Sequence, residues 1–412
     1  MSQNDRPPPE NFFTPRTPVS REMFSPREEV QLQQRLEDTL AEKGSQIMLY
    51  GDTGVGKTSL LLHVAGDKNL GVVRIECFSG KSFQDLMRDA FAAIAEVQEL
   101  RLEVTETKSS LGETGAEVGF PVIARLKGRL LAESITTEKR EFEIVEQPLI
   151  DALIDKLVES GKSIIFFDNF ENVHDPQVKV QVAEFIGFIS DRASATGNVK
   201  VVLAGIADTG SDLLTLSQAA SRRTVEFEVP RMPESELAPI ILRGMGFLKI
   251  RIEDKVVRRV TKLSDGFPYV THLLGLHLAR EVGRQNATEA TDNALNQAVS
   301  IALAEFREEF RARYDSAREL SGKVRPREHI MEALAWADGR DFRAPDIGAI
   351  YRKRFHLDQA AGLAFLNPAL GQLLTPKYGS VLRRRGSRRR YQYSFSNPLM
   401  RPYIRLRHAA PD

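Results

Sequence analysis

The chain has 412 residues, of which 42% are hydrophobic, and its formal net charge at pH 7 is +1. Because this length exceeds that of one ordinary domain, we expect two or three domains with packed cores. The one cysteine, Cys77, excludes a disulfide within the chain. No apolar run is long enough to cross a bilayer and no signal-peptide pattern is present, so we expect a cytoplasmic protein.

The first segment, residues 1–22, is polar and rich in proline, which predicts a disordered or extended arm. Residues 25–28, Ser-Pro-Arg-Glu, have the pattern of a helix start, with a capping serine and a proline at the first helical position. A helix is therefore expected to begin there and to place Leu32, Leu36 and Leu40 on one face.

A glycine-rich loop follows the first expected strand, Gln46–Tyr50. Residues 51–59 read Gly-Asp-Thr-Gly-Val-Gly-Lys-Thr-Ser, which matches the phosphate-loop pattern G-x-x-x-x-G-K-S/T, and a helical stretch comes next. Glycines let the backbone direct its N–H groups at phosphate, and the helix N-terminus adds a partial positive charge. Lys57 can reach the β- and γ-phosphates, and the Thr58 hydroxyl can ligate Mg²⁺. The motif predicts that ATP with Mg²⁺ is bound by Gly51, Asp52, Thr53, Gly54, Val55, Gly56, Lys57, Thr58 and Ser59.

Four more strand candidates follow and are separated by helical stretches: Gly71–Cys77, Ser163–Asp168, Lys200–Ala207 and Thr224–Pro230. Unbroken apolar strands that alternate with helices predict an α/β fold with a parallel sheet covered on both faces. Residues 102–142, between the second and third strands, are irregular and rich in glycine, threonine and glutamate. We interpret them as a hairpin-like insertion or a mobile loop.

The pattern becomes helical after residue 232, and residues 233–315 are expected to form a helical lid. Residues 325–407 contain three short helical stretches and then a β-like tail rich in arginine and aromatic residues, which are the components of a winged helix. The predicted organisation is therefore an arm at 1–22, a P-loop α/β domain at 23–232, a helical lid at 233–315 and a winged-helix-like domain at 325–407.

Basic residues gather in the C-terminal tail. From Lys377 to Arg407 the chain has one lysine, nine arginines and no acidic residue, which indicates a polyanionic partner. The leading interpretation is contact with duplex DNA; a solvated loop or a protein-binding module is the alternative. The residues expected to contact nucleic acid are Arg383, Arg384, Arg385, Arg388, Arg389 and Arg390.

The order of these parts resembles the AAA+ ATPases of the initiator type, such as the origin-recognition ATPases, and the related STAND ATPases. The resemblance covers about residues 19–407. Phe24–Arg27 is similar to the family segment that flanks the adenine, and Asp208 and Thr209 occupy the place of the family's first sensor residue. The turn at Gly266–Tyr269 is similar to the family's second sensor, but Tyr269 stands where an arginine is expected.

Residues 164–168, Ile-Ile-Phe-Phe-Asp, resemble the family's Walker B strand, which implies that Asp168 holds Mg²⁺ through water. The next residue is Asn169, where the family has a glutamate that polarises the attacking water. Asparagine cannot accept a proton, so hydrolysis is expected to be slow, with Glu171 as the candidate base and a solvated loop acid as the alternative for that residue. Arg223 resembles the arginine finger that reaches a neighbour's γ-phosphate; a surface arginine is the alternative.

The combined interpretation is an ATP-dependent molecular switch that hydrolyses slowly, forms homo-oligomers and binds DNA through its basic C-terminal domain. The alternative is a STAND-type signalling ATPase whose C-terminal domain binds a protein trigger or effector. Salt-sensitive DNA binding would favour the first hypothesis, and an acidic protein surface complementary to the basic tail would favour the second.

Overall fold

The computed structural model describes residues 6–106, 142–194, 198–206, 218–306, 308–318, 325–358, 362–387 and 390–410. Several predicted features lie outside these ranges: residues 107–141 of the expected insertion, the sensor candidates Asp208 and Thr209, and Arg388 and Arg389 of the basic tail. No helix among the described residues combines the length and apolarity needed to cross a membrane.

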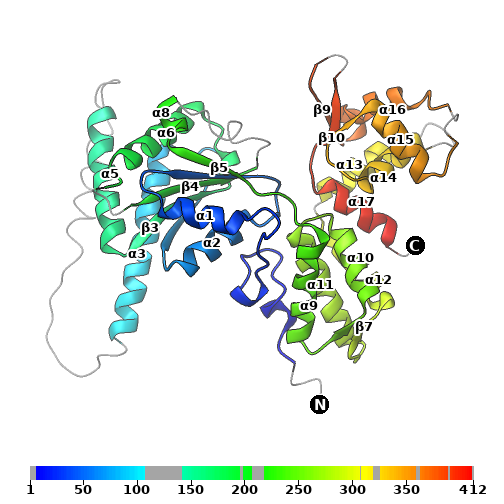
Figure 1. Cartoon of the computed structure of the whole chain (residues 1–412), viewed down its shortest axis with the longest axis horizontal. Coiled ribbons are helices and arrows are strands. Elements are labelled where there is room, and N and C mark those ends of the chain that lie inside the picture. Colours follow the sequence, from blue (N-terminus) through cyan, green and yellow to red (C-terminus); the bar gives the residue numbers. More distant parts are fainter. Residues whose placement is uncertain are drawn as a thin grey trace. The chain divides into compact units, whose positions relative to one another are not determined.

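The chain divides into two compact units (Figure 1). The first, which we call the sheet unit, comprises residues 34–50 and 64–228. The second, which we call the lid unit, comprises residues 1–33, 51–63 and 229–412, so the phosphate loop is grouped with the helices that follow the sheet. The domain boundaries expected from the sequence stay a prediction.

The sheet unit contains five parallel strands in the order β2-β3-β4-β1-β5. All five were predicted within two residues at each end, and their bounds are β1 Gln46–Tyr50, β2 Gly71–Glu76, β3 Lys162–Asp168, β4 Lys200–Gly205 and β5 Thr224–Glu228. The predicted α/β fold with a parallel sheet is confirmed.

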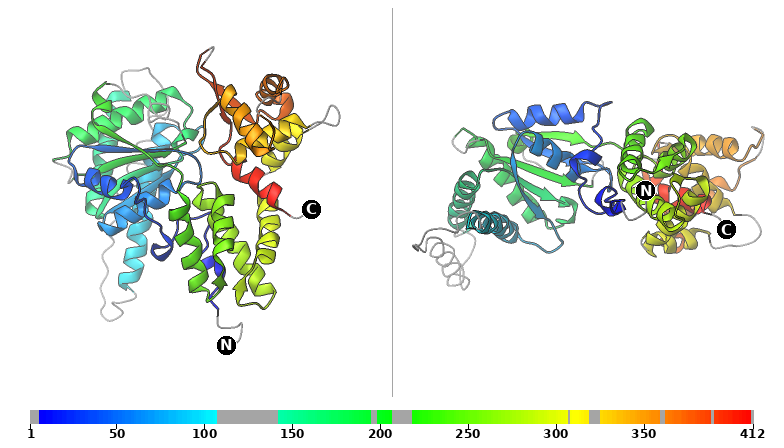
Figure 2. Two further views of the ribbon diagram at one scale, coloured as in Figure 1. Left: turned by 45° about the vertical axis from the view of Figure 1, so that its right-hand side comes forward. Right: turned by 90° about the horizontal axis from the view of Figure 1, so that it is seen from below.

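Helices cover both faces of this sheet because its central strands are apolar on both sides. The core on one face joins the strands to α3 (Phe83–Glu106), α5 (Phe142–Glu159) and α6 (Pro176–Asp191). Alternate strand residues such as Phe167 point into this core, and the next residue along the strand, Phe166, is equally buried on the other side. There α1 (Leu32–Ala41) lies over the sheet, opposite α3 and α5 (Figure 2).

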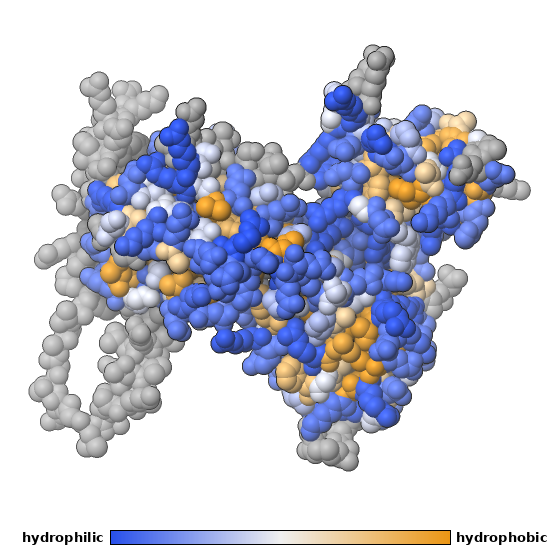
Figure 3. All heavy atoms as spheres, viewed as in Figure 1, coloured by the Kyte–Doolittle hydropathy of each residue, from blue (hydrophilic) through white to orange (hydrophobic). Residues whose placement is uncertain are grey.

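The lid unit contains the four lid helices and the C-terminal domain. The lid consists of α9 Glu234–Phe247, α10 Asp254–Ser264, α11 Pro268–Arg284 and α12 Asp292–Glu305, with a two-stranded parallel pair of β6 Arg251–Ile252 and β7 Glu289–Ala290. On the face shown in Figure 3, apolar residues form separate spots among hydrophilic ones. This lid is the helical region that the sequence pattern predicted.

The C-terminal domain combines helices with a small antiparallel sheet of order β8-β10-β9. Its elements are α13 Glu308–Arg318, α14 Pro326–Ala335, β8 Phe342–Arg343, α15 Ala344–Arg354, α16 Leu366–Leu373, β9 Leu382–Arg385, β10 Gln392–Phe395 and α17 Met400–Ala409. The expected components, three short helical stretches and a β-like segment, correspond to α14, α15 and α16 and to the β9–β10 hairpin. The tail was expected to be β-like throughout, but after β10 it forms α17, whose residues 400–406 are all buried.

The N-terminal segment, expected to be a disordered or extended arm, is held against the lid helices. Residues 6–24 are mostly irregular, with short 3-10 turns at Pro9–Asn11 and Arg21–Met23, but Phe13 is only 1% exposed. A Cβ atom at Gly244 or Gly275 would lie 2.2 or 2.4 Å from the Phe13 ring, so this ring fills a slot that two lid glycines leave open. Burial of one aromatic side chain holds the segment on α9 and α11.

The predicted helix start at residues 25–28 is wrong, because α1 begins at Leu32. The hydroxyl of Ser25 does not cap a helix and instead donates a hydrogen bond to the carbonyl of Glu236, at 2.8 Å. Gln31 has a φ of 47°, in the left-handed region, so the helix cannot extend back through it. Leu32, Leu36 and Leu40 are buried on one face, as predicted.

Candidate nucleotide site

The phosphate loop directly follows β1 and leads into α2 (Lys57–Asp67). Its three glycines, Gly51, Gly54 and Gly56, have φ values of 145°, 78° and 95°. These positive values are strained for any residue with a Cβ atom, which is why the loop requires glycine at each position. The conformation curls the backbone in front of the N-terminus of α2, where a helix favours an anion.

Two neighbours pack closely against this loop. A Cβ atom at Gly51 would lie 2.5 Å from the carbonyl oxygen of Val229, and one at Gly54 would lie 3.1 Å from Cβ of Tyr269. The backbone N–H of Tyr269 also approaches the Gly54 carbonyl oxygen, with 3.4 Å between nitrogen and oxygen. Tyr269, which stands where the resemblance leads one to expect an arginine, therefore packs on the phosphate loop through its backbone and Cβ.

Lys57 folds back over the loop that precedes it. Its Nζ donates hydrogen bonds to the carbonyl oxygens of Gly51 and Asp52, both at 3.0 Å. The ammonium group is thus held at the start of the phosphate loop, within the turn that the motif predicts to surround the β- and γ-phosphates.

Arg27 supports the loop from the N-terminal segment and is 3% exposed. Its guanidinium donates hydrogen bonds to the carbonyl of Val55 in the loop and to that of Pro230, the latter at 2.9 Å. Burial lowers the pKa of Arg27 to about 10, so it stays charged at neutral pH. Close by in the chain, the Phe24 ring stacks on His63 of α2, with 4.2 Å between ring centroids. Residues 24–27, expected to flank the adenine, thus contact the loop and its helix.

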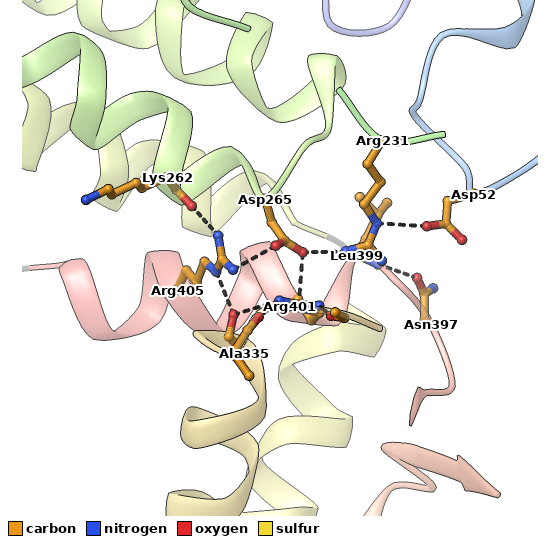
Figure 4. Close-up of polar contacts among 11 residues, drawn as sticks. Asp52, Arg231, Lys262, Asp265, Ala335, Asn397, Leu399, Arg401 and Arg405 are labelled. Atoms are coloured by element: carbon orange, nitrogen blue, oxygen red, sulfur yellow. Dashed lines mark hydrogen bonds and ion pairs between the residues drawn. The ribbon is translucent and has the colours of Figure 1, made fainter. Parts of the chain in front are cut away.

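The sequence did not reveal the partner of Asp52, the second residue of the loop. The Nε of Arg231 donates a hydrogen bond to the Asp52 carboxylate at 2.9 Å, and Nη1 of the same side chain binds Asp265 at 2.6 Å (Figure 4). The only available signal was one arginine in the Pro-Arg-Met-Pro turn after the fifth strand, at 230–233. That signal has no specificity, because the chain carries 57 lysine and arginine residues.

In the sheet unit, Asp168 ends β3 as predicted and its side chain is 3% exposed. Arg74 of β2 binds its carboxylate with two nitrogens, Nε at 2.9 Å and Nη2 at 2.7 Å. The other carboxylate oxygen accepts the Asn169 backbone N–H at 3.1 Å. Arg74 was missed, although a charged residue between Val73 and Ile75 in an apolar strand was a visible signal.

The two residues considered for water activation lie just after β3. Asn169 has a φ of 57°, and its side-chain amide is 3.4 Å from a Glu76 carboxylate oxygen. Glu171 lies in a 3-10 turn, Phe170–Asn172, where its carboxylate accepts the backbone N–H of Ile206 at 3.0 Å. Glu171 is therefore held at the carboxyl end of β4, the strand between β3 and β1.

The sheet topology brings the expected ends together. Strands β1 and β3 lie on either side of β4 and run parallel to it, so Tyr50 and Asp168 end at the same edge of the sheet. The phosphate loop begins at the residue after Tyr50. In open parallel sheets, ligands bind beyond the carboxyl ends of the strands.

Arg223 lies between α8 (Gln218–Ser221) and β5, and it is not a solitary surface cation. Its guanidinium forms an ion pair with Asp191, the last residue of α6. To reach a phosphate of another subunit it would have to leave this partner.

No group of three or more His, Cys, Asp or Glu side chains that could hold a metal ion occurs within the described ranges. Binding of Mg²⁺ does not require such a cluster, because this ion keeps several waters and commonly binds through one or two protein oxygens and the substrate phosphates. The residues that would hold it are Thr58 and Asp168.

The basic tail forms the β9–β10 hairpin. Arg384 and Arg385 at the end of β9 and Arg390 before β10 are exposed, while Arg383 donates a hydrogen bond to the Ser394 hydroxyl at 3.2 Å. The Arg384 guanidinium lies 4.1 Å from the centroid of the Tyr391 ring. The described part of the hairpin therefore presents several exposed arginines from one short segment.

Comparison with known proteins identifies a domain and a fold. Residues 40–209 match the family model described as an AAA domain. A Walker-type ATPase of Pyrococcus abyssi has a similar structure, with a TM-score of 0.56, 18% identity and coverage of 96% of this chain and 99% of that chain. At that identity the similarity shows a shared fold. Among curated protein sequences, none matches this chain.

Two further structures are less similar. The Aeropyrum pernix ORC2 protein, in its ADPNP–ADP complexes, has a TM-score of 0.48 at 13% identity, and 98% of each chain is covered. The Aeropyrum pernix ORC1 protein in complex with DNA has a TM-score of 0.46 at 16% identity, with coverage of 99% of this chain and 98% of that chain. Both scores fall below 0.5.

Residues 40–209 therefore match an AAA domain, and the shared fold agrees with the P-loop architecture expected from the sequence.

Proposed function

We propose that this protein is an ATP- and Mg²⁺-dependent molecular switch that hydrolyses ATP slowly, forms homo-oligomers and binds duplex DNA through its C-terminal hairpin. The observation that carries the nucleotide part is the geometry of the phosphate loop. Three glycines have positive φ, and Lys57 is held over the carbonyls of Gly51 and Asp52. Such a loop presents backbone N–H groups and one ammonium group to phosphate.

Magnesium completes the site in this proposal. The Thr58 hydroxyl would ligate the ion directly, and Asp168 would hold it through water. Arg74 already binds the Asp168 carboxylate, which supports a role in orienting that carboxylate rather than in replacing the ion. The ion supplies charge neutralisation between the β- and γ-phosphates when it is bound.

Slow hydrolysis follows from the residues after β3. Asn169 can position a water molecule but cannot take its proton. Glu171 is the proposed base, since its contact with Ile206 holds it at the carboxyl edge of β4, beside the strand that leads into the phosphate loop. The hydrogen bond from the Ile206 backbone N–H orients this carboxylate.

The proposals of self-association and of DNA binding both depend on arginine side chains. We propose that Arg223 exchanges its Asp191 partner for the γ-phosphate bound by a neighbouring subunit, because its planar fork suits spread phosphoryl charge. In the hairpin, Arg384, Arg385 and Arg390 are exposed and close in sequence, so they can contact adjacent phosphates of a duplex. Such contacts add affinity without reading sequence.

The decisive experiment is titration of the whole chain with a fluorescent ATP analogue in Mg²⁺. The wild type should bind, and Lys57→Ala should lose at least about tenfold in affinity while circular dichroism stays unchanged. Lys68→Ala is the matched control, because Lys68 follows the same helix and its Nζ pairs with Glu37 at 2.9 Å. Equal affinity of wild type and Lys57→Ala would refute the assignment of the site.

A further inference from the structure

One carboxylate in the lid unit binds three arginines. Asp265 directly follows α10, has a φ of 48° and has a side chain that is 8% exposed. Its oxygens lie 2.6 Å from Arg231, 3.2 Å from Arg401 and 2.7 Å from Arg405 (Figure 4). The contacts join three separate parts of the chain: the segment after β5, the turn between α10 and α11, and α17.

Arg231 connects this cluster to the phosphate loop. Its side chain is 12% exposed, and it binds Asp52 and Asp265 with different nitrogens. The guanidinium also lies 4.4 Å from the centroid of the Phe267 ring. A planar group held by two carboxylates and one aromatic face has little freedom to reorient, so a shift of Asp265 is transmitted to Asp52.

The arginines of α17 are themselves held by backbone carbonyls. Arg401 donates hydrogen bonds to Ala337, at 2.5 Å, and to Gly339. Arg405 donates to Ala335 at 2.6 Å and to Lys262. The positions of these two guanidinium groups therefore report where α17 lies relative to the C-terminal end of α14 and the last turn of α10.

The charge balance of the cluster determines how much the loss of each member would destabilise the fold. Three guanidinium groups share two carboxylates, those of Asp52 and Asp265, and all five side chains are mostly buried. Removal of Asp265 would leave three buried cations close together, which is strongly destabilising. Removal of the Arg405 charge would leave two cations and two anions. Removal of the Arg401 charge would leave the same balance, but the Arg405 side chain is more exposed, at 11% against 5% for Arg401, so the loss of Arg405 should disturb folding less.

We propose that Arg231 and Asp265 are positioning residues of the nucleotide site, and that α17 acts through them to set the affinity of the phosphate loop for nucleotide. The inference rests on the proposed binding of ATP. Arg231 holds the Asp52 carboxylate, and the backbone carbonyl of Asp52 accepts a hydrogen bond from Lys57. The cluster therefore fixes the part of the phosphate loop that holds the Lys57 ammonium, and this ammonium must leave that position to contact a phosphate. By linkage, nucleotide bound at the loop must stabilise the position of α17 to the same extent.

A double-mutant cycle on nucleotide affinity tests the relay. The dissociation constant of a fluorescent, non-hydrolysable ATP analogue is measured with the full chain as wild type, Asp52→Asn, Arg405→Gln and the double variant. We expect Arg405→Gln to change the affinity about fivefold or more in the wild-type background and less than about twofold when Asp52→Asn is present. Arg407→Gln is the matched control, because Arg407 lies on α17 and over the Tyr314 ring, 6.0 Å from its centroid.

The outcomes separate this inference from the proposed function. Absence of binding by the wild type overturns the nucleotide site and the relay together. Binding by the wild type with equal affinity in a folded Arg405→Gln, or with equal effects in both backgrounds, overturns the relay alone. A purely structural role would lower the thermal midpoint without this dependence on Asp52.

Hydrogen exchange gives a second test that requires no substitution in α17. Addition of the same analogue should slow exchange of the α17 amides in the wild type, and this protection should be lost in Asp52→Asn at saturating analogue. Amides of α15 (Ala344–Arg354), which contributes no residue to the cluster, serve as the internal reference. Unchanged exchange in α17 while the analogue is bound would overturn the relay even if Arg405→Gln failed to fold.

Discussion

The backbone N–H of Thr14 donates a hydrogen bond to Nδ1 of His272, at 3.2 Å, and this histidine is 2% exposed in α11. The contact requires an unprotonated Nδ1. Burial, together with the nearby charge of Arg243, lowers the pKa of His272 to about 4 from its ordinary value near 6.5. The ring that receives the N-terminal segment is therefore neutral throughout the physiological range.

The first prediction concerns acid stability. Between pH 6.5 and 4 the unfolded chain binds a proton at His272 that the folded chain does not, so the free energy of unfolding falls as pH falls through this window. The loss is on the order of 3 kcal/mol for a shift of this size. His272→Gln should flatten this dependence in urea denaturation at pH 5 and 7.5, whereas His356→Asn, at an exposed turn, should not. Identical pH slopes for wild type and His272→Gln would contradict the argument.

The second prediction concerns the first glycine of the phosphate loop. Gly51→Ala places a Cβ atom 2.5 Å from the Val229 carbonyl oxygen at a φ of 145°, so the loop must shift. We expect weaker binding of a fluorescent ATP analogue and a loss of roughly 1–3 kcal/mol in stability. Gly66→Ala in α2 meets no atom within 4 Å and should stabilise by up to about 1 kcal/mol through helix propensity. The contrast between these two variants separates loop geometry from a general effect of added methyl groups.

The third prediction concerns hydrolysis. Asn169→Glu introduces a carboxylate that can accept a proton from water, but the side chain at this position lies next to Glu76. The like charge and the left-handed φ of 57° both oppose it. We therefore expect faster steady-state phosphate release for Asn169→Glu combined with Glu76→Gln than for either single variant.

Glu171→Gln addresses the proposed base in the same assay. It should slow phosphate release about tenfold or more if Glu171 takes the proton. Glu184→Gln, on α6, is the charge-matched control. A wild type that hydrolyses rapidly and is unaffected by Glu171→Gln would refute the base assignment.

The fourth prediction concerns self-association. A non-hydrolysable ATP analogue should increase the sedimentation coefficient of the wild type, because a bound γ-phosphate draws Arg223 away from Asp191 to a neighbouring subunit. Arg223→Ala should abolish this increase and Arg222→Ala should retain it. Asp191→Ala, which removes the ion pair between Arg223 and Asp191, should lower the protein concentration at which association begins. A monomer in every nucleotide state would remove the finger hypothesis.

The fifth prediction concerns the hairpin. Alanine at Arg388, Arg389 and Arg390 should weaken binding to all duplexes about equally and flatten the slope of log affinity against log salt by roughly two to three units. Alanine at Arg251, Arg258 and Arg311, which are exposed and lie outside the hairpin, removes the same charge and should leave the slope nearly unchanged. ATP binding should survive both sets of changes. Absence of DNA binding by the wild type at low salt would make the signalling ATPase with a protein partner the leading account.

Local patterns were sufficient wherever one segment determines its own conformation. The five strands were predicted from apolar runs, and the phosphate loop from a motif whose glycines require positive φ. Local patterns failed at residues 25–28, where a good capping sequence is used instead for a tertiary hydrogen bond from Ser25 to Glu236. They also failed at α17, where a β-like tail was expected; the buried carbonyl and carboxylate partners of its arginines are distant in the chain and explain the burial of this helix.

The sequence by itself determined the class of this protein: a phosphate loop in a strand–loop–helix context, an acid at the end of a later apolar strand, and a helical and basic C-terminal region. Each of these is a short-range pattern, and its chemistry depends on residues that are near one another in the chain. Tertiary structure alone decided which long-range partners those residues have. Arg74 holds Asp168, Arg27 holds Val55, and Arg231 joins Asp52 to Asp265, because contacts between distant segments depend on packing and not on local sequence.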